Sequence, residues 1–143
     1  MEAKPRNLQQ KSLRQLLLMR SEWFEERVYQ GSKTRGYGFV TPSMVRLFAH
    51  MGRRAVSIPE LARRLSISRQ AVHVTIHEAM RHGVVEFEEC DFDKRLKLVK
   101  FSEAGMQMLE AAASNLDEVQ KELESRIGKK DVETLRRILE KTW

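Results

Sequence analysis

Several side chains suited to reading DNA bases follow one another closely near the middle of the chain. An arginine can bridge O6 and N7 of guanine and a glutamine can bridge N6 and N7 of adenine, so Arg69 and Gln70 carry the strongest chemistry of this kind. His73 and His77 stand four residues apart and share one face of a helix. Ser68 can cap that helix and also donate to a phosphate. An ordinary solvated helix face is the alternative explanation for these residues.

The residues around them predict the helix that turns them outward. Apolar residues recur at intervals of three and four over residues 69–82, which indicates one buried helical face, and Gly83 is a typical stop signal. The inward positions are Val72, Ile76, Ala79 and Met80. Val74 falls on the opposite face and therefore joins the outward residues.

A second, shorter helix is predicted directly before the first. Ser57 and Glu60 have the spacing of a capping box, in which the serine hydroxyl accepts from a free backbone N–H and the glutamate reaches back to another. The helix opened by this box continues to Leu65, and residues 66–68 then break the pattern. Two helices joined by a three-residue turn predict a helix-turn-helix over residues 57–82.

Residues 83–101 are predicted to form a β-hairpin. Residues 84–87 and 96–101 are rich in β-branched and aromatic side chains, and the polar stretch 90–95 between them is suited to a hairpin tip. Upstream, Thr41 and Pro42 supply the cap and first-turn proline of a further helix that runs to about Met51, with apolar residues nearly all around it. Together these elements predict a winged helix-turn-helix over residues 41–101.

Helices are also predicted on both sides of this unit. Residues 9–29 form an amphipathic helix that ends at a segment containing Gly31, Gly36 and Gly38. Residues 102–143 form a long helix, broken at Gly128, and a final amphipathic helix. The long helix has two interlocking seven-residue series that make a heptad seam: Met106, Ala113, Gln120 and Ile127, and Leu109, Leu116 and Leu123. Such a narrow seam requires a partner helix, either from this chain or from a second copy.

Composition sets outer limits on the function. A chain of 143 residues fits a single domain, 1–143, and 41% hydrophobic residues are enough for a core. The net charge is +6, and residues 41–101 carry 11 Lys or Arg against 7 Asp or Glu, which favours a nucleic acid as partner. Solvated lysines on an ordinary soluble protein would give the same balance. We expect a cytoplasmic location and no membrane contact, since the sequence has no apolar run of spanning length and no signal core at its start.

We expect no enzyme activity, no cofactor and no metal. The sequence has no Gly-rich phosphate loop, no metal-ligand cluster and no nucleophile elbow, so no catalytic residue is assigned. Its one cysteine, Cys90, can form neither an internal disulfide nor a thiolate zinc cluster. His73 and His77 supply two metal ligands, and a third, such as Glu60 or His50, would have to come from elsewhere in the fold.

The order of these elements resembles the MarR family of bacterial transcriptional regulators over nearly the whole chain. The segment SIPELARRLSISRQAVHVTIHEAMRHGVV resembles the family's helix-turn-helix and the exit that follows it. The segment DKRLKLVKFSEAG resembles its wing-tip Asp-x-Arg, followed by a short motif that opens a long helix. The helix before the motif agrees with the family as well.

The resemblance implies a mainly α fold with a small β-hairpin wing and with N- and C-terminal dimerisation helices, here 9–29 and 102–143. It further implies a homodimer on a pseudo-palindromic operator in double-stranded DNA, with recognition helices in major grooves and wings in flanking minor grooves. The protein would act as a repressor controlled by a small aromatic effector or another signal. Arg95 would enter the minor groove, held by a carboxylate–guanidinium pair with Asp93. The residues expected to bind DNA are Ser68, Arg69, Gln70, His73, Val74, His77, Lys94 and Arg95.

Some features depart from the family's pattern and leave alternatives open. Glu86, Glu88 and Glu89 occupy a strand where basic residues are frequent, and Val74 stands where an arginine is frequent. Either the glutamates face away from DNA, or the wing is used differently, or the chain is a protein–protein interaction module that uses its acidic wing.

Two further groups of residues allow more than one interpretation. Cys90 is either a redox-sensitive thiol beside Lys94 and Arg95 or an incidental residue. Several aromatic residues either line an effector pocket or belong to the core: Trp23, Phe24, Tyr29, Tyr37 and Phe39.

Overall fold

The computed structural model describes residues 10–143, which form six helices and three short strands in this part of the chain. These residues fall into two compact units, and helices α1 and α5 each run from one unit into the other. One unit consists of Ser32–Ser114, and the other combines the described residues up to Gly31 with Asn115–Trp143. In the described part no helix is long and apolar enough to cross a membrane. The mainly helical winged fold expected from the sequence is confirmed.

The Ser32–Ser114 unit contains the predicted helix-turn-helix. Helix α2 spans Pro42–Met51, α3 spans Ile58–Leu65 and α4 spans Arg69–Arg81. The hydroxyls of Thr41, Ser57 and Ser68 each accept a hydrogen bond from a backbone N–H three residues later, which confirms all three predicted N-caps. In the turn, Ser66 adopts the left-handed conformation with φ at 53°.

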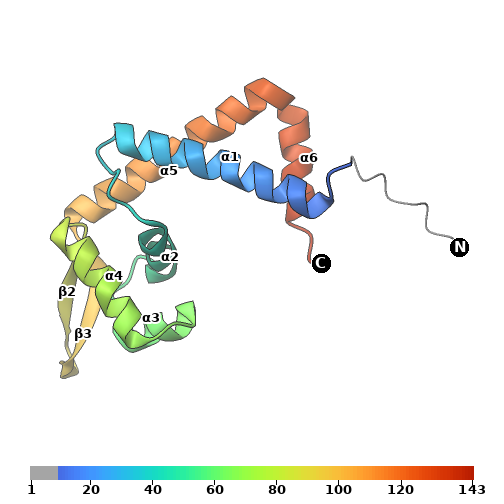
Figure 1. Cartoon of the computed structure of the whole chain (residues 1–143). Helices are drawn as coiled ribbons and strands as arrows, with labels where there is room; N and C mark the ends of the chain where they lie inside the picture. Colours follow the sequence, from blue (N-terminus) through green and yellow to red (C-terminus); the bar gives the residue numbers. More distant parts are fainter. Residues whose placement is uncertain (1–9) are drawn as a thin grey trace, which may run out of the picture. The chain divides into compact units, whose positions relative to one another are not determined.

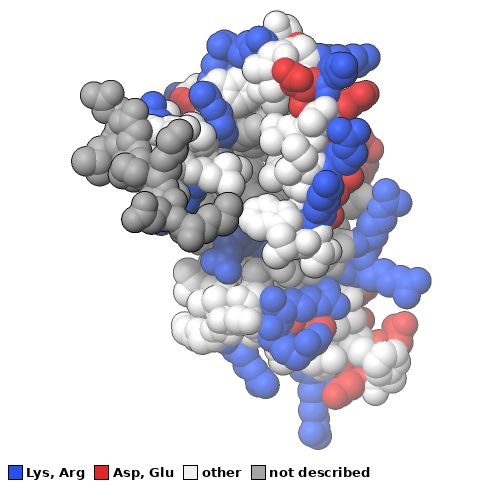
Figure 2. All heavy atoms as spheres, turned by 90° about the vertical axis from the view of Figure 1, so that its right-hand side faces the viewer, with Lys and Arg blue, Asp and Glu red and all other residues white. Residues whose placement is uncertain are grey.

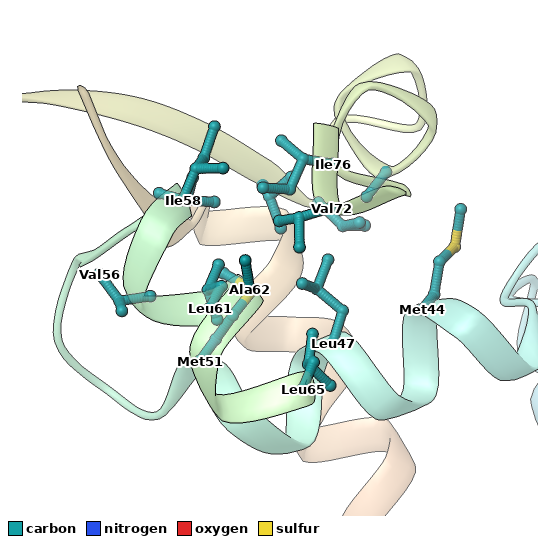
Figure 3. Packing of buried hydrophobic residues seen from close by; sticks show 14 of the residues in the cluster. Met44, Leu47, Met51, Val56, Ile58, Leu61, Ala62, Leu65, Val72 and Ile76 are labelled. Atoms are coloured by element: carbon teal, nitrogen blue, oxygen red, sulfur yellow. The ribbon is translucent and has the colours of Figure 1, made fainter. Parts of the chain in front are cut away.

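The core of this unit lies where the three helices meet the sheet. Met44 and Leu47 of α2, Leu61 of α3, and Val72 and Ile76 of α4 are at most 1% exposed, and Figure 3 shows these side chains converging from the three helices. Helix α2 is less enclosed than its apolar sequence predicts, because Val45 is 56% exposed. The His82 ring stacks on the Phe39 ring, with centroids 4.0 Å apart, and holds the end of α4 against the segment before α2.

The wing is an antiparallel hairpin of β2 (Val85–Cys90) and β3 (Asp93–Phe101). The strands are longer than predicted, because Cys90 already pairs with Asp93 and the connection consists of residues 91–92 rather than 90–95. A register shift lies between Glu89 and Cys90, so β3 carries extra residues close to the tip. Cross-strand pairing that continues through this irregularity accounts for the shorter tip.

A third strand, β1 (Val56–Ser57), was not predicted from the sequence. It pairs with β3 through Val56 opposite Val99 and Ser57 opposite Leu98, which gives the sheet order β1-β3-β2. Ser57 therefore serves both as the last residue of β1 and as the N-cap of α3. Ser57 thus joins the strand that pairs with the base of the wing to the helix-turn-helix.

The other unit consists of helical segments joined by polar contacts. Helix α1 spans Leu13–Thr34, α5 spans Glu103–Ile127 and α6 spans Lys129–Leu139. The Arg27 guanidinium lies 3.0 Å from the Glu122 carboxylate and 4.2 Å from the centre of the Trp23 ring. The buried Asn115 amide donates to the carbonyl of Val28. These contacts join α1 to the second half of α5.

Helix α1 differs from the predicted helix over 9–29 at both ends. Residue 9 lies outside the described residues, and the helix begins after Ser12, whose hydroxyl accepts from the backbone N–H of Gln15. The Gln15 side chain in turn accepts from the Ser12 backbone N–H, which makes a capping box. At its other end the helix continues through Gly31 to Thr34. Glycine at this position packs directly against Asn115, so a tertiary contact replaces the expected break.

Candidate nucleic-acid interface

Helix α4 presents one face to the core and the other to solvent. Ser68 fixes its first turn by accepting a hydrogen bond of 3.1 Å from the backbone N–H of Ala71. Val72, Ile76 and Ala79 are fully buried, which sets the rotation of the helix about its axis. The face opposite these residues is consequently directed outward, as the spacing of the apolar residues predicts.

The structure places the predicted base-reading side chains together on this outward face. Ser68, Arg69, Gln70, Val74 and His77 are exposed, and His73 is half-buried. A shallow hollow of about 520 Å³ follows the same face, lined by Gln70, His73, Val74, His77, Glu78 and Arg81. Long polar side chains on the first turns of such a helix have the reach and the donors to contact base edges.

The two histidines lie next to each other along α4. Their rings are nearly parallel, with centroids 6.0 Å apart, and the His77 ring meets the Phe87 ring of β2 edge to face at 6.3 Å. In the part of the chain that the structure describes, no three metal-ligating side chains come together. The contact with Phe87 ties this face of α4 to the strand behind it.

The wing places Lys94 and Arg95 beside the hairpin tip, both exposed. Asp93 does not pair with the Arg95 guanidinium as expected. Its carboxylate instead accepts a 3.0 Å hydrogen bond from the backbone N–H of Arg95, a local turn that fixes the backbone of β3. The guanidinium of Arg95 has no ion pair in the described structure.

The acidic strand is partly neutralised within the wing. Because side chains alternate along a strand, Glu86 and Glu88 lie on the sheet face opposite to Phe87, which contacts α4. Both carboxylates flank the ammonium group of Lys100, at 3.6 Å and 3.3 Å respectively. Chiefly the hydrogen bond with Glu88 raises the pKa of Lys100. These two glutamates therefore face away from α4.

The arginines of α3 are held by an acidic neighbour. Arg63 donates to both carboxylate oxygens of Glu60, and Arg64 donates to one of them at 2.9 Å and to the carbonyl of His50 at 2.9 Å. Hydrogen bonds from Arg63 and then Arg64 lower the pKa of Glu60 to about 2. The Glu60 side chain thus pairs with these arginines, whereas the capping box predicts that it reaches back toward Ser57.

One exposed residue at the wing was missed from the sequence. Phe92, in the connection between β2 and β3, is 92% exposed. The available signal was an aromatic residue alone among charged neighbours in a predicted hairpin tip. By contrast, Cys90 beside it is buried, and Tyr37 and Phe39 pack against the core of their unit.

Basic side chains outnumber acidic side chains in this protein. Figure 2 shows one face, on which Lys and Arg side chains project at more places than Asp and Glu do. The formal charge of +6 is in keeping with this view. A surface of this kind attracts polyanions by long-range electrostatics.

Comparison with known proteins relates this geometry to a family. The model of the MarR family matches residues 40–96, which hold α2, α3, α4 and most of the wing. No curated protein sequence gives a significant match.

Solved structures of the same fold extend the likeness over the rest of the chain. Wild-type MarR from E. coli is 20% identical, with a TM-score of 0.69, and the alignment covers 92% of this chain and 96% of that one. A mutant of S. aureus MepR bound to an oligodeoxyribonucleotide is 19% identical over 91% and 94% of the two chains, with a TM-score of 0.64. NadR in complex with 4-hydroxyphenylacetate is 17% identical over 95% of each chain, with a TM-score of 0.60. The winged helix of this chain thus matches the model of the MarR family, and the chain as a whole shares the fold of these solved structures.

Proposed function

We propose that this chain is a homodimeric transcriptional repressor that binds a pseudo-palindromic operator in double-stranded DNA. The observation that carries the proposal is the outward face of α4, where Arg69, Gln70, Val74 and His77 are exposed on a MarR-family winged helix. Its role is sequence-specific binding without catalysis. The oligonucleotide bound to MepR supports DNA as the partner of this fold.

Each part of the proposed interface has its own task. Arg69 and Gln70 read base edges in the major groove, with Val74, His73 and His77 further along the helix. Ser68 holds the helix start against a phosphate. Lys94 and Arg95 bring the wing to the flanking minor groove, where a guanidinium gains from the enhanced negative potential. Two-fold symmetry then sets the half-sites about 34 to 36 Å apart.

Exposed apolar residues in the α1, α5 and α6 segments support the dimer. Helix α1 has 22 residues and none of them is buried. Its apolar side chains are exposed as well: Leu13 is 70% exposed and Leu18 is 52% exposed. Isolated apolar side chains on a surface are common, but a concentration of them marks an interaction site. The large apolar residues exposed in this unit are Leu13, Leu16, Leu17, Leu18, Met19, Tyr29, Leu116, Ile127, Leu135, Ile138, Leu139 and Trp143.

The seam of α5 gives a second argument for a second copy. Within the chain α5 buries Met108, Asn115 and Val119. The predicted heptad positions Met106 and Leu116 are instead 42% and 53% exposed. These two seam positions are therefore left exposed by the chain, and a partner helix from a second copy would cover them.

The proposal includes control by a signal that releases DNA. The complex of NadR with 4-hydroxyphenylacetate supports a small aromatic effector as one form of this signal. A library of small aromatic acids can be screened in an operator-binding assay. The effector is the compound that lowers the affinity of the protein for the operator. A compound that binds the free and the DNA-bound protein equally well does not change the affinity for DNA, so it is not the effector.

The test of DNA binding starts with full-length protein. Selection of bound fragments from random-sequence duplexes yields the operator, and the selected site is expected to be a pseudo-palindrome. The affinity for this operator should fall steeply as salt is added. The slope of log affinity against log salt concentration should be about −0.9 for each phosphate that the protein neutralises. Sedimentation or light scattering should give twice the chain mass. A lone subunit, or binding that salt does not affect, would contradict the proposal.

The direction of regulation has a separate test. The selected site is placed across a reporter promoter in a host that expresses the protein. A repressor lowers reporter output, and a variant lacking the base contacts, Arg69→Ala with Gln70→Ala, restores it. Output that rises with the protein identifies an activator instead.

The acidic wing offers the rival function, a protein-docking surface. Its test replaces Glu86, Glu88 and Glu89 together by glutamine. A DNA-binding protein keeps or increases its affinity for DNA, because negative charge near phosphates is removed. The pairing of Glu86 and Glu88 with Lys100, on the sheet face away from α4, favours this outcome.

A further inference from the structure

The tip of the wing carries an apolar side chain that no part of the described chain covers. Phe92 is 92% exposed, the highest value among the large hydrophobic residues of the described structure. Phenylalanine has no polar atom to interact with water, so this exposure costs free energy in the unbound protein. A partner that covers the ring would remove this free-energy cost.

The local backbone holds Phe92 in this exposed place. The connection is short, since Cys90 pairs with Asp93 across it, and Cys90 itself is only 3% exposed. On the far side, Asp93 accepts from the Arg95 backbone N–H and fixes the start of β3. Phe92 therefore lies between two anchored residues.

The hairpin that carries Phe92 extends beyond the rest of its sheet. Strand β1 pairs with Leu98 and Val99 only, so the hairpin from Lys97 to the tip is a two-stranded ribbon. A narrow ribbon with a two-residue connection can enter a groove that a wider sheet cannot. The extension moves the ring clear of the core of its own unit.

The tip lies at the same end of the unit as the start of α4. The contact between His77 and Phe87 fixes β2 beside α4. From these residues, β2 reaches about 16 Å to its tip at 3.3 Å per residue, while α4 reaches about 12 Å to its start at 1.5 Å per residue. Figure 1 shows the hairpin tip and the first turn of α4, next to α3, at the lower end of the picture. The exposed ring and the base-reading residues are thus directed to one side.

The charge around Phe92 does not oppose an approach to phosphates. The acidic residues Asp91 and Asp93 are balanced by Lys94 and Arg95, so these four neighbours have no net formal charge. The carboxylate of Asp93 is engaged by the Arg95 backbone N–H. The ring therefore lies in a segment, residues 91–95, that has no net formal charge.

We propose that Phe92 is an apolar wedge that packs into the minor groove of the DNA flanking each half-site, beside Arg95. Apolar side chains inserted from the minor groove partly unstack a base step and bend the duplex. The wedge adds shape-dependent selectivity outside the bases that α4 reads, because flexible pyrimidine–purine steps open at lower cost. This inference rests on the proposed function, since it requires the wing to lie on DNA.

The experiment uses full-length protein and the duplex selected by the wild type from random sequence. Phe92→Ala is expected to weaken binding by about tenfold or more, the scale expected for truncating a buried aromatic at an interface. Phe92→Leu should recover part of the loss, because it restores an apolar side chain. The matched control is Val45→Ala, another exposed apolar residue of the same unit, which should bind as the wild type does.

The salt dependence separates Phe92 from its charged neighbour. Phe92→Ala should leave the slope of log affinity against log salt unchanged, because phenylalanine neutralises no phosphate. Arg95→Gln should reduce the magnitude of that slope by about 0.9. A fluorescent 2-aminopurine placed in the flanking steps should brighten on binding of the wild type, as its base unstacks, and brighten less with Phe92→Ala.

The outcomes distinguish this inference from the proposed function. If Phe92→Ala binds the selected duplex with wild-type affinity and the same 2-aminopurine signal, the wedge is wrong while DNA binding stands. Such a result would also be expected if Phe92 served a protein partner. If the wild type selects no duplex at all, the proposed function fails and the wedge fails with it.

Discussion

Gly31 and Asn115 occupy adjoining positions so closely that a Cβ atom added at Gly31 would overlap the amide oxygen of Asn115. The Asn115 side chain is 3% exposed and donates to the Val28 carbonyl, one turn before Gly31 on α1. The absence of a side chain at Gly31 thus allows α5 to approach α1. The glycine has this role within a helix rather than at its end.

Gly31→Ala should therefore destabilise the protein, although alanine favours helix more than glycine does. We expect a loss of about 1 to 3 kcal/mol in the free energy of unfolding, the usual range for overpacking. The double variant with Asn115→Ala should cost less than the sum of the single variants, because the overlap is removed. Urea titrations at equal protein concentration measure these changes. Ser21→Ala, on the exposed face of α1, is the control, and an additive double variant would refute the contact.

Gly105→Ala should be more harmful than Gly31→Ala. A Cβ atom at Gly105 would overlap the backbone carbonyl oxygen of Val84, which cannot rotate away as an amide side chain can. We expect a loss at or above the upper end of about 1 to 3 kcal/mol, measured by the same urea titration. Gln107→Ala, exposed on the same helix, should have little effect. Equal losses at Gly31 and Gly105 would show that the backbone contact relaxes easily.

Glu60 should make stability depend on pH in the acidic range. Its pKa falls from 4.5 to about 2 in the folded chain, chiefly through the hydrogen bond from Arg63 and then that from Arg64. Because the folded-state pKa is the lower one, the stabilisation is present above pH 4.5 and is lost as the pH falls toward about 2. Glu60→Gln should have a lower urea midpoint at pH 7 than the wild type, and the two midpoints should converge toward pH 2. A constant difference between them would contradict the lowered pKa.

Gln70→Ala should relax sequence preference at one base pair in each half-site. A bidentate contact between glutamine and adenine is worth about 1 to 3 kcal/mol of discrimination, so the preference there should fall by that amount. The salt dependence of DNA binding by this variant should remain that of the wild type, because glutamine is uncharged. Competition between selected duplexes that differ at single positions measures the effect. Glu78→Gln, further along the same hollow, should leave the preference in place, and a uniform loss over all positions for Gln70→Ala would indicate a backbone contact.

Leu116→Glu should separate the proposed dimer into single chains. Leu116 is 53% exposed on the α5 seam, where a carboxylate would be buried by a second copy without a partner charge. Light scattering at micromolar concentration should report the mass of one chain, and affinity for the palindromic site should fall. Val45→Glu, 56% exposed on α2, should remain a dimer. A Leu116→Glu variant that keeps twice the chain mass would place the interface elsewhere.

The sequence predicts those parts of the fold that depend on neighbours along the chain. Thr41, Ser57 and Ser68 cap their helices because the hydroxyl and its N–H partner are three residues apart. The rotation of α4 follows equally from local spacing, so the outward position of Arg69 and Gln70 was predictable. Contacts with DNA at these residues stay a prediction.

The parts that depend on distant contacts were not predictable in this way. Gly31 looks like a helix stop, and its packing on Asn115 involves a residue far along the chain. Strand β1 has only two residues, and its extended form follows from pairing with Val99 and Leu98. The carboxylate of Asp93 has two possible partners in Arg95, and the sequence alone does not distinguish the backbone N–H from the guanidinium.

Ser57 has a consequence for how any signal would reach the DNA. Because the same residue ends β1 and caps α3, the strand that pairs with the base of β3 continues directly into the helix-turn-helix. The contact of His77 with Phe87 joins α4 to β2. These two contacts hold the base of the wing against α3 and α4. In the proposed complex with DNA, a signal that moves α4 would therefore move the base of the wing with it.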